Sequence, residues 1–214
     1  MHTVVFAARK GGASKTTLTG HLAVEAVRQG LGPVVMMDTD PQQSLAAWWQ
    51  EREAEEPKLA AVGLSTLGAE VSRLRDTPGW LFIDTPPLVP ETIEAVIAVA
   101  DLVVIPVKPS PHDLKGVGIT VKLAKRQGKR FCFVVTQAIA RASLTTQALL
   151  ALSQHGPVAT AIMHYRVDYA GAMTDGRTVQ EIDPQGKAAE EIRQLLNYVV
   201  AQVRECGLAE AANA

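Results

Sequence analysis

The sequence predicts an α/β fold in which a mostly parallel sheet lies between layers of helices. Two observations support this: the short apolar runs lack strict polar alternation, and longer amphipathic segments separate them. Continuous apolar character is typical of strands buried on both faces. Repeated strand–helix–strand units then imply right-handed crossovers and a layered domain. The predicted strands are residues 3–8, 33–38, 80–84, 102–107, 130–136 and 158–163.

Capping residues bound the predicted helices between these strands. A helix over 15–29 stops at Gly30, one over 90–100 opens at Pro90, and one over 112–127 stops at Gly128. Residues 143–155 form another helix, and the amphipathic segment 186–206 forms the last. The charged stretch 51–61 is interpreted as an exposed connection. We expect one domain over residues 1–206 and a flexible tail over 207–214.

Composition limits the classes of function. The chain has 214 residues, 47% of them hydrophobic, and a formal charge of -1, which excludes a generally basic protein that coats nucleic acid. Any DNA binding must come from a local patch or from oligomerisation. The two cysteines, Cys132 and Cys206, have no metal-ligand spacing, which favours a reducing compartment. No signal peptide or membrane-length apolar run is seen, so we expect a cytoplasmic protein.

The stretch "ARKGGASKTT", residues 8–17, has the pattern of a phosphate-binding loop. It follows the first predicted strand and opens the first predicted helix, which is the required context. Backbone N–H groups of residues 11–16 would surround phosphates at the positive end of the helix dipole. Lys15 would reach the terminal phosphates, and the Thr16 hydroxyl would take one position on Mg²⁺. An ordinary strand–turn–helix remains the alternative.

Ser14 departs from the usual loop, which carries glycine immediately before the lysine. If this position requires a positive φ, a side chain there costs about 1–2 kcal/mol of strain. The remaining donors would still bind phosphate, so we expect Ser14 to weaken the site without removing it.

Three further signals follow the loop in order. "MMDTDPQQS" places Asp38 and Asp40 at the end of the second strand, where ligands bind in open α/β sheets. "WLFIDTPP" ends an apolar strand in Asp84, as a metal-supporting Walker B strand does. "VIPVKPSPHD" adds a rigid proline loop at the same sheet edge, suited to a base pocket. Each signal taken alone also fits ordinary turn chemistry; their order and spacing together favour a nucleotide site.

With these residues, the sequence resembles the ParA/MinD family of deviant-Walker P-loop ATPases, and within it the small ParA proteins of plasmid partition. The resemblance covers almost the whole chain and extends to "YRVDYAGAMTDGRTVQE", residues 165–181. It implies the P-loop NTPase three-layer sandwich, with a mostly parallel central sheet flanked by helices. It also implies a slow, partner-stimulated Mg²⁺-dependent ATPase that forms an ATP-sandwich homodimer.

The resemblance assigns roles residue by residue. Lys10 matches the signature lysine that reaches the partner's phosphate in the dimer, so that hydrolysis and association are coupled. Asp40 would position the attacking water, and Asp38 and Asp84 would support the Mg²⁺ that Thr16 binds. The residues implied to contact ATP are Lys10, Gly11, Gly12, Ala13, Ser14, Lys15, Thr16 and Thr17, with Pro109, Thr136 and Gln137 near adenine.

Partners follow from the same resemblance. We expect non-specific, nucleoid-associated DNA binding by the ATP-dependent dimer and stimulation by a centromere-binding partner similar to ParB or ParG. Arg166 matches a family arginine, and Lys122, Lys125, Arg126, Lys129 and Arg130 are further DNA-binding candidates, although their segment also fits a solvated helix end. The acidic last helix, with Glu190, Glu191 and Glu205, is unlike a basic membrane anchor, so membrane binding is disfavoured.

Two other functions remain open on the sequence. One is an ATP-dependent biosynthetic ligase of the same superfamily, similar to dethiobiotin synthetase or cobyrinic acid diamide synthase, although no Cys/His pair suits an amidotransferase. The other is a nucleotide switch or positioning protein in which Ser14 has suppressed hydrolysis. Salt-sensitive DNA binding that requires ATP would separate partition from biosynthesis.

Overall fold

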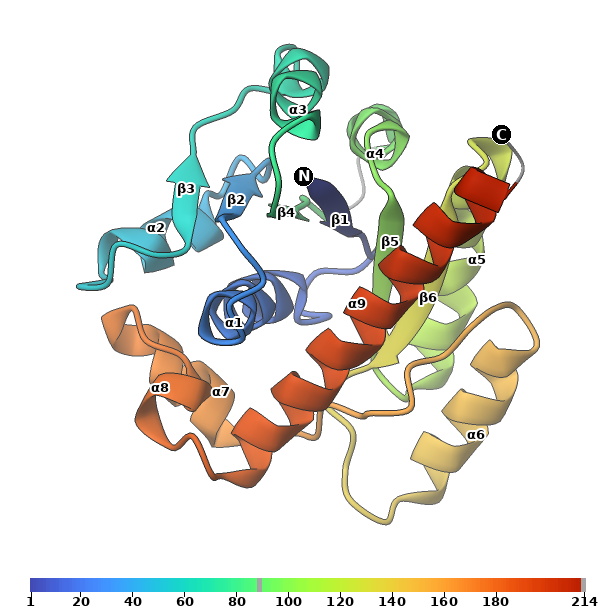
Figure 1. Ribbon diagram of the computed structural model, residues 1–214. Helices are drawn as coiled ribbons and strands as arrows, with labels where there is room; N and C mark the ends of the chain where they lie inside the picture. Colours follow the sequence, from blue (N-terminus) through green and yellow to red (C-terminus); the bar gives the residue numbers. More distant parts are fainter. Residues whose placement is uncertain (88–89, 213–214) are drawn as a thin grey trace.

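A six-stranded parallel sheet forms the centre of the protein in the computed structural model, which describes residues 1–87 and 90–212 (Figure 1). Its strand order is β3-β2-β4-β1-β5-β6, and all its ladders are parallel. The strands are β1 (His2–Phe6), β2 (Val34–Asp38), β3 (Lys58–Ala60), β4 (Trp80–Asp84), β5 (Leu102–Val107) and β6 (Arg130–Val135). The predicted fold class is confirmed.

Two strand predictions are wrong in detail. Residues 158–163 form no strand; they join β6 only through backbone hydrogen bonds and an isolated bridge between Phe133 and Val158. The side chains of Ala159, Ala161 and Met163 are buried in the core instead, which explains the apolar run. Conversely, β3 lies inside the charged segment interpreted as a connection. It is a three-residue edge strand paired with β2, with one exposed and two half-buried residues, and is too short to show a clear apolar pattern.

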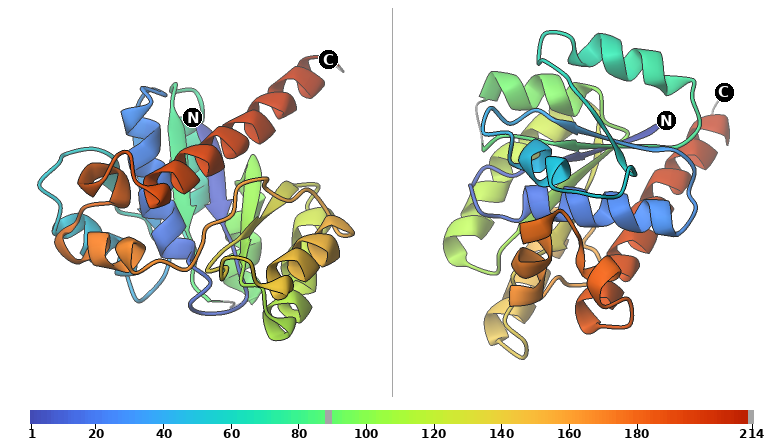
Figure 2. Two further views of the ribbon diagram at one scale, coloured as in Figure 1. Left: turned by 90° about the horizontal axis from the view of Figure 1, so that it is seen from below. Right: turned by 90° about the vertical axis from the view of Figure 1, so that its left-hand side faces the viewer.

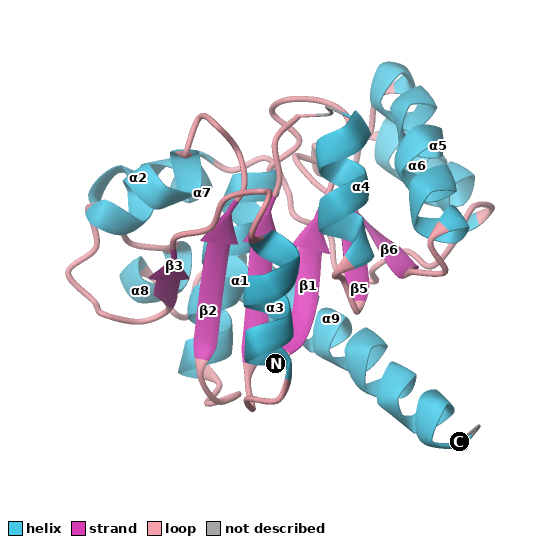
Figure 3. Cartoon of the chain, turned by 90° about the horizontal axis from the view of Figure 1, so that it is seen from above, coloured by secondary structure: helices cyan, strands magenta, loops and turns pink. Residues whose placement is uncertain are grey.

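Helices cover both faces of the sheet (Figures 1 and 3). One hydrophobic cluster joins the sheet to α1 (Lys15–Arg28) and α9 (Lys187–Ala212), with α2 (Ser44–Gln50) and α7 (Val167–Ala172) at its edge. The other joins it to α3 (Leu67–Arg75), α4 (Pro90–Ala98) and α5 (Pro111–Arg126). The remaining elements are α6 (Ser143–Ser153), a 3₁₀ turn (Met173–Asp175) and α8 (Val179–Ile182).

The helix boundaries follow the expected capping chemistry. Gly30 and Gly128 adopt φ of 66° and 64° immediately after the C-caps of α1 and α5, a left-handed conformation in which glycine carries no steric cost. At the other end of the chain, α9 runs past Cys206 to Ala212, and its C-terminal end projects away from the rest of the molecule in the left view of Figure 2. The tail predicted over residues 207–214 therefore begins as a continuation of this helix.

Strand register places the acidic residues together. Asp38 and Asp84 are paired at the carboxyl ends of β2 and β4, and Phe6, the last residue of β1, is paired with Asp84 on its other side. Because all these strands are parallel, the segment after β1 emerges at the same sheet edge as both carboxylates.

Candidate nucleotide-binding site

The loop between β1 and α1 presents unpaired backbone donors at this edge. The first backbone hydrogen bond of α1 runs from the N–H of Leu18 to the carbonyl of Ser14, so within the described ranges the N–H groups of residues 14–17 have no acceptor in the helix. A run of unpaired N–H groups at a helix N-terminus is an anion site, and the α1 macrodipole adds to it. The loop therefore fits the phosphates of a nucleotide.

Ser14 occupies the left-handed region, with φ 69° and ψ 26°. The positive φ on which the strain argument depends is therefore present. Although Ser14 is the N-cap residue of α1, its side chain makes no capping hydrogen bond. Its hydroxyl instead accepts a 2.8 Å hydrogen bond from Nε2 of Gln137, which lies after β6.

Lys15, Thr16 and Asp84 form the inner part of the site. Lys15 is 6% exposed, and burial lowers its pKa while the charges of Asp84 and Asp40 oppose that shift. The Thr16 hydroxyl donates a 2.6 Å hydrogen bond to Oδ2 of Asp84. Asp84 is fully buried, and burial is the largest of the effects that raise the pKa of its carboxyl to about 7. A buried lysine and a buried carboxyl at one sheet edge fit a site that receives both phosphate and a metal ion.

A hydroxyl beside a carboxylate suits Mg²⁺, which is typically held by one or two protein oxygens together with phosphate oxygens and water. Among residues 1–87 and 90–212, no group of three or more His, Cys, Asp and Glu side chains could hold a metal ion alone. A metal at Thr16 and Asp84 would depend on the nucleotide for its remaining ligands.

Asp38 and Asp40 have different environments, although both follow β2. Asp38 is buried, and its oxygens accept backbone hydrogen bonds from Asp40 (2.9 Å), Leu45 (3.0 Å) and Ala46 (3.0 Å). It thereby anchors the start of α2. Burial raises the pKa of Asp38, and the three N–H groups oppose that shift. Asp40 is half-buried, and among the described residues its carboxylate accepts one bond, from the N–H of Gln42 at 2.9 Å, which leaves lone pairs for a water molecule.

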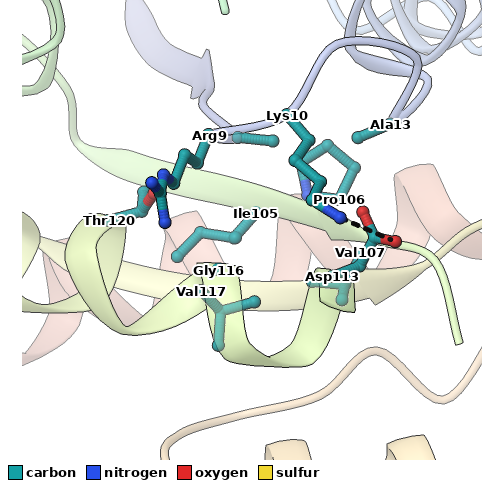
Figure 4. A pocket seen from close by; sticks show the side chains of 11 residues that line it. Arg9, Lys10, Ala13, Ile105, Pro106, Val107, Asp113, Gly116, Val117 and Thr120 are labelled. Atoms are coloured by element: carbon teal, nitrogen blue, oxygen red, sulfur yellow. Dashed lines mark ion pairs between the residues drawn. The ribbon is translucent and has the colours of Figure 1, made fainter. Parts of the chain in front are cut away.

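Lys10 lies on the outer side of the loop. Its Nζ is 3.7 Å from Oδ2 of Asp113, near the start of α5, and its side chain is 43% exposed. Figure 4 shows Lys10 turned toward Asp113 while Arg9 extends the other way, toward Thr120. A small cavity of about 20 Å³ lies between this stretch, β5 and α5.

The residues expected near adenine lie in two different places. Thr136 and Gln137 lie against the loop itself: Thr136 Oγ1 donates to the carbonyl of Ala13 at 3.3 Å, and Gln137 Nε2 donates to that of Gly12 at 2.8 Å. Pro109 lies just before Ser110, the N-cap of α5. Lys108, which the sequence did not single out, also lies at the loop: its Nζ is 3.7 Å from the position that a Cβ on Gly12 would occupy. Its position directly after β5, at the same end of the sheet as the loop, is the sequence feature that could have identified it.

The DNA-binding candidates fall at two places. Lys122, Lys125, Arg126, Lys129 and Arg130 lie near the end of α5 and the start of β6, at the sheet edge opposite the loop.

Several of these side chains are already engaged. Arg126 pairs with Glu94, and Arg130 donates to the carbonyl of Gln202 at 2.9 Å. Lys125 lies 6.0 Å above the ring of Phe131.

Arg166 lies past the far end of β6, at the same edge as the loop. Its Nε and Nη2 donate to Oε1 of Glu191 at 3.1 and 2.6 Å. Glu191 also accepts from Tyr169 and from the backbone N–H of His164. The structure therefore brings the phosphate-loop residues together but separates Arg166 from the other basic candidates.

The family is decided by comparison with known proteins. Residues 4–179 match the family model described as the CobQ/CobB/MinD/ParA nucleotide binding domain. The chain belongs to this family. Within this family, the similar curated proteins identify the chain as a ParA/MinD-type ATPase. It is 28% identical over 209 residues to maintenance of carboxysome distribution protein A from Halothiobacillus neapolitanus, covering 92% of this chain and 96% of the relative. It is 34% identical over 116 residues to protein ParA from Rhizobium radiobacter, covering 53% and 51%.

Solved structures confirm the fold of this ParA/MinD-type ATPase. The Pyrococcus furiosus cell division ATPase MinD superposes with a TM-score of 0.78 at 16% identity, covering 94% of this chain and 98% of that one. The Cyanothece McdA(D38A)–ATP complex superposes with a TM-score of 0.74 at 15% identity, covering 96% of each. The expected family and fold are therefore confirmed. Among the described helices, none combines the length and apolar character needed to cross a membrane.

Proposed function

We propose that this ParA/MinD-type ATPase binds ATP with Mg²⁺, pairs with a second copy of itself, and as a pair binds non-specific DNA. A cargo-bound partner similar to ParB or ParG stimulates its hydrolysis, so that the cycle positions or segregates a large intracellular cargo. The observation that best supports this proposal is that the two lysines of one loop differ in burial. Lys15 is buried beside the carboxylates, whereas Lys10 is exposed and its ion pair among the described residues is with Asp113.

This contrast favours two different roles. Lys15 is positioned to bind phosphate within its own chain. Lys10 lies on the outer side of the loop, where its ammonium group could reach a phosphate held by a second copy. A cation supplied by a partner stabilises negative charge only while the pair exists, so turnover depends on association.

The chain's own groups then divide the work of hydrolysis. The loop N–H groups and Lys15 bind and orient phosphate, and Thr16 and Asp84 would hold Mg²⁺, which neutralises phosphate charge. Asp40 has free lone pairs and is therefore the residue we assign to orient water. Asp38 contributes by fixing the turn that carries Asp40 (2.9 Å from Asp40 N to Asp38 Oδ1).

The relatives support the positioning role and suggest two cargo classes. The relative matched over nearly its whole length has a name referring to carboxysome distribution, whereas the ParA relative is matched over about half its length. A protein assembly is therefore our first cargo candidate and a plasmid our second. A biosynthetic ligase is less favoured, since the two relatives named above are a carboxysome distribution protein and a ParA protein.

The deciding experiment is titration with ATP and Mg²⁺, with association followed by sedimentation. Wild type should bind ATP and form dimers. Lys15→Ala should lose ATP binding, whereas Lys10→Ala should retain binding and lose ATP-dependent dimerisation. Lys58→Ala, an exposed lysine on β3, is the matched control. Equal ATP binding by wild type and Lys15→Ala would exclude the proposed site, and an ATP-bound wild type that stays monomeric would exclude the paired mechanism.

A further inference from the structure

Ser14 in the phosphate loop and Gln137 after β6 both have a positive φ, and their side chains are in contact. Ser14 has φ 69° and Gln137 has φ 51°. Such a conformation costs a non-glycine residue on the order of 1 kcal/mol, and it persists where surrounding contacts hold it. The contact joining them is the 2.8 Å hydrogen bond from the Gln137 amide to the Ser14 hydroxyl.

The Gln137 amide has one hydrogen for each of two neighbouring acceptors. Nε2 lies 2.8 Å from the carbonyl oxygen of Gly12 and 2.8 Å from Oγ of Ser14, so both of its N–H bonds are used. The preceding Thr136 hydroxyl donates to the carbonyl of Ala13. Gly12, Ala13 and Ser14 thus accept hydrogen bonds from Thr136 and Gln137, the two residues that directly follow β6. Hydrogen bonds to the loop carbonyls leave the opposite side of each peptide, its N–H, available to phosphate.

We propose that Gln137 is a positioning residue for nucleotide phosphates, and that Ser14 is its partner in holding the loop open. In this chain the Gln137–Ser14 hydrogen bond does what glycine does for a usual phosphate loop: it makes the left-handed turn before Lys15 stable. The inference rests on the proposed nucleotide site. It differs from the sequence expectation for Gln137, which was contact with adenine.

The geometry argues against a helix-capping role for Ser14 and against donation to a base by Gln137. Ser14 does not cap α1, although serine at an N-cap commonly does. Its one side-chain hydrogen bond among the described residues is the bond from Gln137. Gln137 is half-buried, and its amide nitrogen is already saturated by the loop. Its amide nitrogen therefore has no N–H left to donate to a base.

A double-mutant cycle on ATP affinity tests the proposal. Each lost hydrogen bond of about 1 kcal/mol corresponds to roughly a fivefold loss of affinity. Ser14→Ala should weaken ATP binding about fivefold and Gln137→Ala about 5- to 30-fold. In the Gln137→Ala background, adding Ser14→Ala should have almost no further effect, because the hydroxyl has already lost its partner. Effects that multiply would overturn the proposal.

Inorganic tripolyphosphate separates a loop role from a base contact. Gln137→Ala should weaken tripolyphosphate and ATP by similar factors. A loss confined to ATP would place Gln137 at adenine and overturn the proposal. Gln137→Glu keeps the side-chain size, removes the donating group and adds a negative charge beside the loop, so it should weaken both ligands at least as much as Gln137→Ala. Gln154→Ala, an exposed glutamine at the end of α6, is the control and should bind both ligands as wild type does.

Ser14→Gly gives a second, opposed comparison. It loses the hydroxyl as Ser14→Ala does but relieves the left-handed strain, so its ATP affinity should stay within about threefold of wild type. Thermal melting without nucleotide should show all variants folded. If wild type binds neither ATP nor tripolyphosphate, the proposed function fails with the inference. If wild type binds and Lys15→Ala does not, while the Ser14 and Gln137 effects multiply, only the inference fails.

Discussion

The hydroxyl of Thr16 donates a 2.6 Å hydrogen bond to the fully buried carboxyl group of Asp84. This joins the first helical turn after the phosphate loop to the end of β4. Burial raises the pKa of Asp84 and the nearby charge of Asp38 adds to it, while the Thr16 bond and Lys15 act in the opposite direction.

The pKa of about 7 predicts how stability without nucleotide depends on pH. Asp84 has an ordinary value of 3.8 when exposed in the unfolded chain. Because the folded value is raised, its contribution to stability is fully present below pH 3.8 and is lost as pH rises through about 7. Asp84→Asn, which stays neutral, should remove this dependence. In magnesium-free buffer, wild type should lose on the order of 5–10 °C of melting temperature relative to the variant between pH 4 and pH 8.

Asp76→Asn, at the exposed end of α3, controls for removal of a carboxylate. Its melting temperature should follow that of wild type across the range. Parallel curves for wild type and Asp84→Asn would show that Asp84 is ionised in the folded protein throughout.

Asp38 and Asp40 should separate stability from turnover. Asn at position 38 offers one acceptor oxygen where the carboxylate satisfies three backbone N–H groups. Asp38→Asn should therefore destabilise the protein by about 1–3 kcal/mol. Asp40→Asn can still accept from Gln42, so its melting temperature should change little. Its ATP turnover should fall at least about tenfold, because an amide orients water less well than a carboxylate.

Thermal melting and phosphate release on the same two preparations check this pair of predictions. An unchanged melting temperature for Asp38→Asn, or normal turnover for Asp40→Asn, would contradict the division of roles.

The sequence predicted the features that follow from local pattern and strand order, but not those that depend on contacts between distant parts of the chain. Glycine at the end of α1, the buried parallel strands and the convergence of Asp38 with Asp84 all follow from local pattern and parallel register. The short strand β3 carries no apolar pattern, so only its pairing with β2 reveals it. The positive φ of Ser14 could be expected from the loop pattern, but its contact with Gln137 joins positions 123 residues apart. No local signal encodes such a contact.

The basic candidates should differ in what they contribute to DNA binding. In the presence of ATP, Lys129→Ala should weaken binding and reduce the slope of log affinity against log salt by about 0.9 if it contacts one phosphate. Arg166→Ala should instead lower the melting temperature as well, because it removes the 2.6 Å partner of the partly buried Glu191.

Binding to a random duplex at four salt concentrations measures the slopes, and Arg73→Ala, exposed on α3, is the control. A Lys129→Ala slope equal to that of wild type would place the DNA surface elsewhere. An Arg166→Ala protein with normal melting and reduced DNA affinity would show that Arg166 acts at the DNA alone.

The ion pair between Lys10 and Asp113 predicts a test of dimerisation. If Lys10 must leave Asp113 to reach a second copy, removing the Asp113 charge should favour the dimer. The lysine of this pair is 43% exposed and the aspartate 15%, and a pair in contact with solvent is worth about 0–1 kcal/mol, so Asp113→Asn should lower the ATP concentration needed for dimerisation by up to about fivefold. Asn retains an acceptor for the hydroxyl of Ser110, which contacts Asp113 at the start of α5.

The gain in dimerisation of Asp113→Asn should disappear in 1 M salt, where the Debye length is about 3 Å. Sedimentation across an ATP series at low and high salt measures both effects, with Lys10→Ala/Asp113→Asn as the control that should form no ATP-dependent dimer. Weaker dimerisation of Asp113→Asn at low salt would mean that the pair orients Lys10 for the partner instead of holding it back.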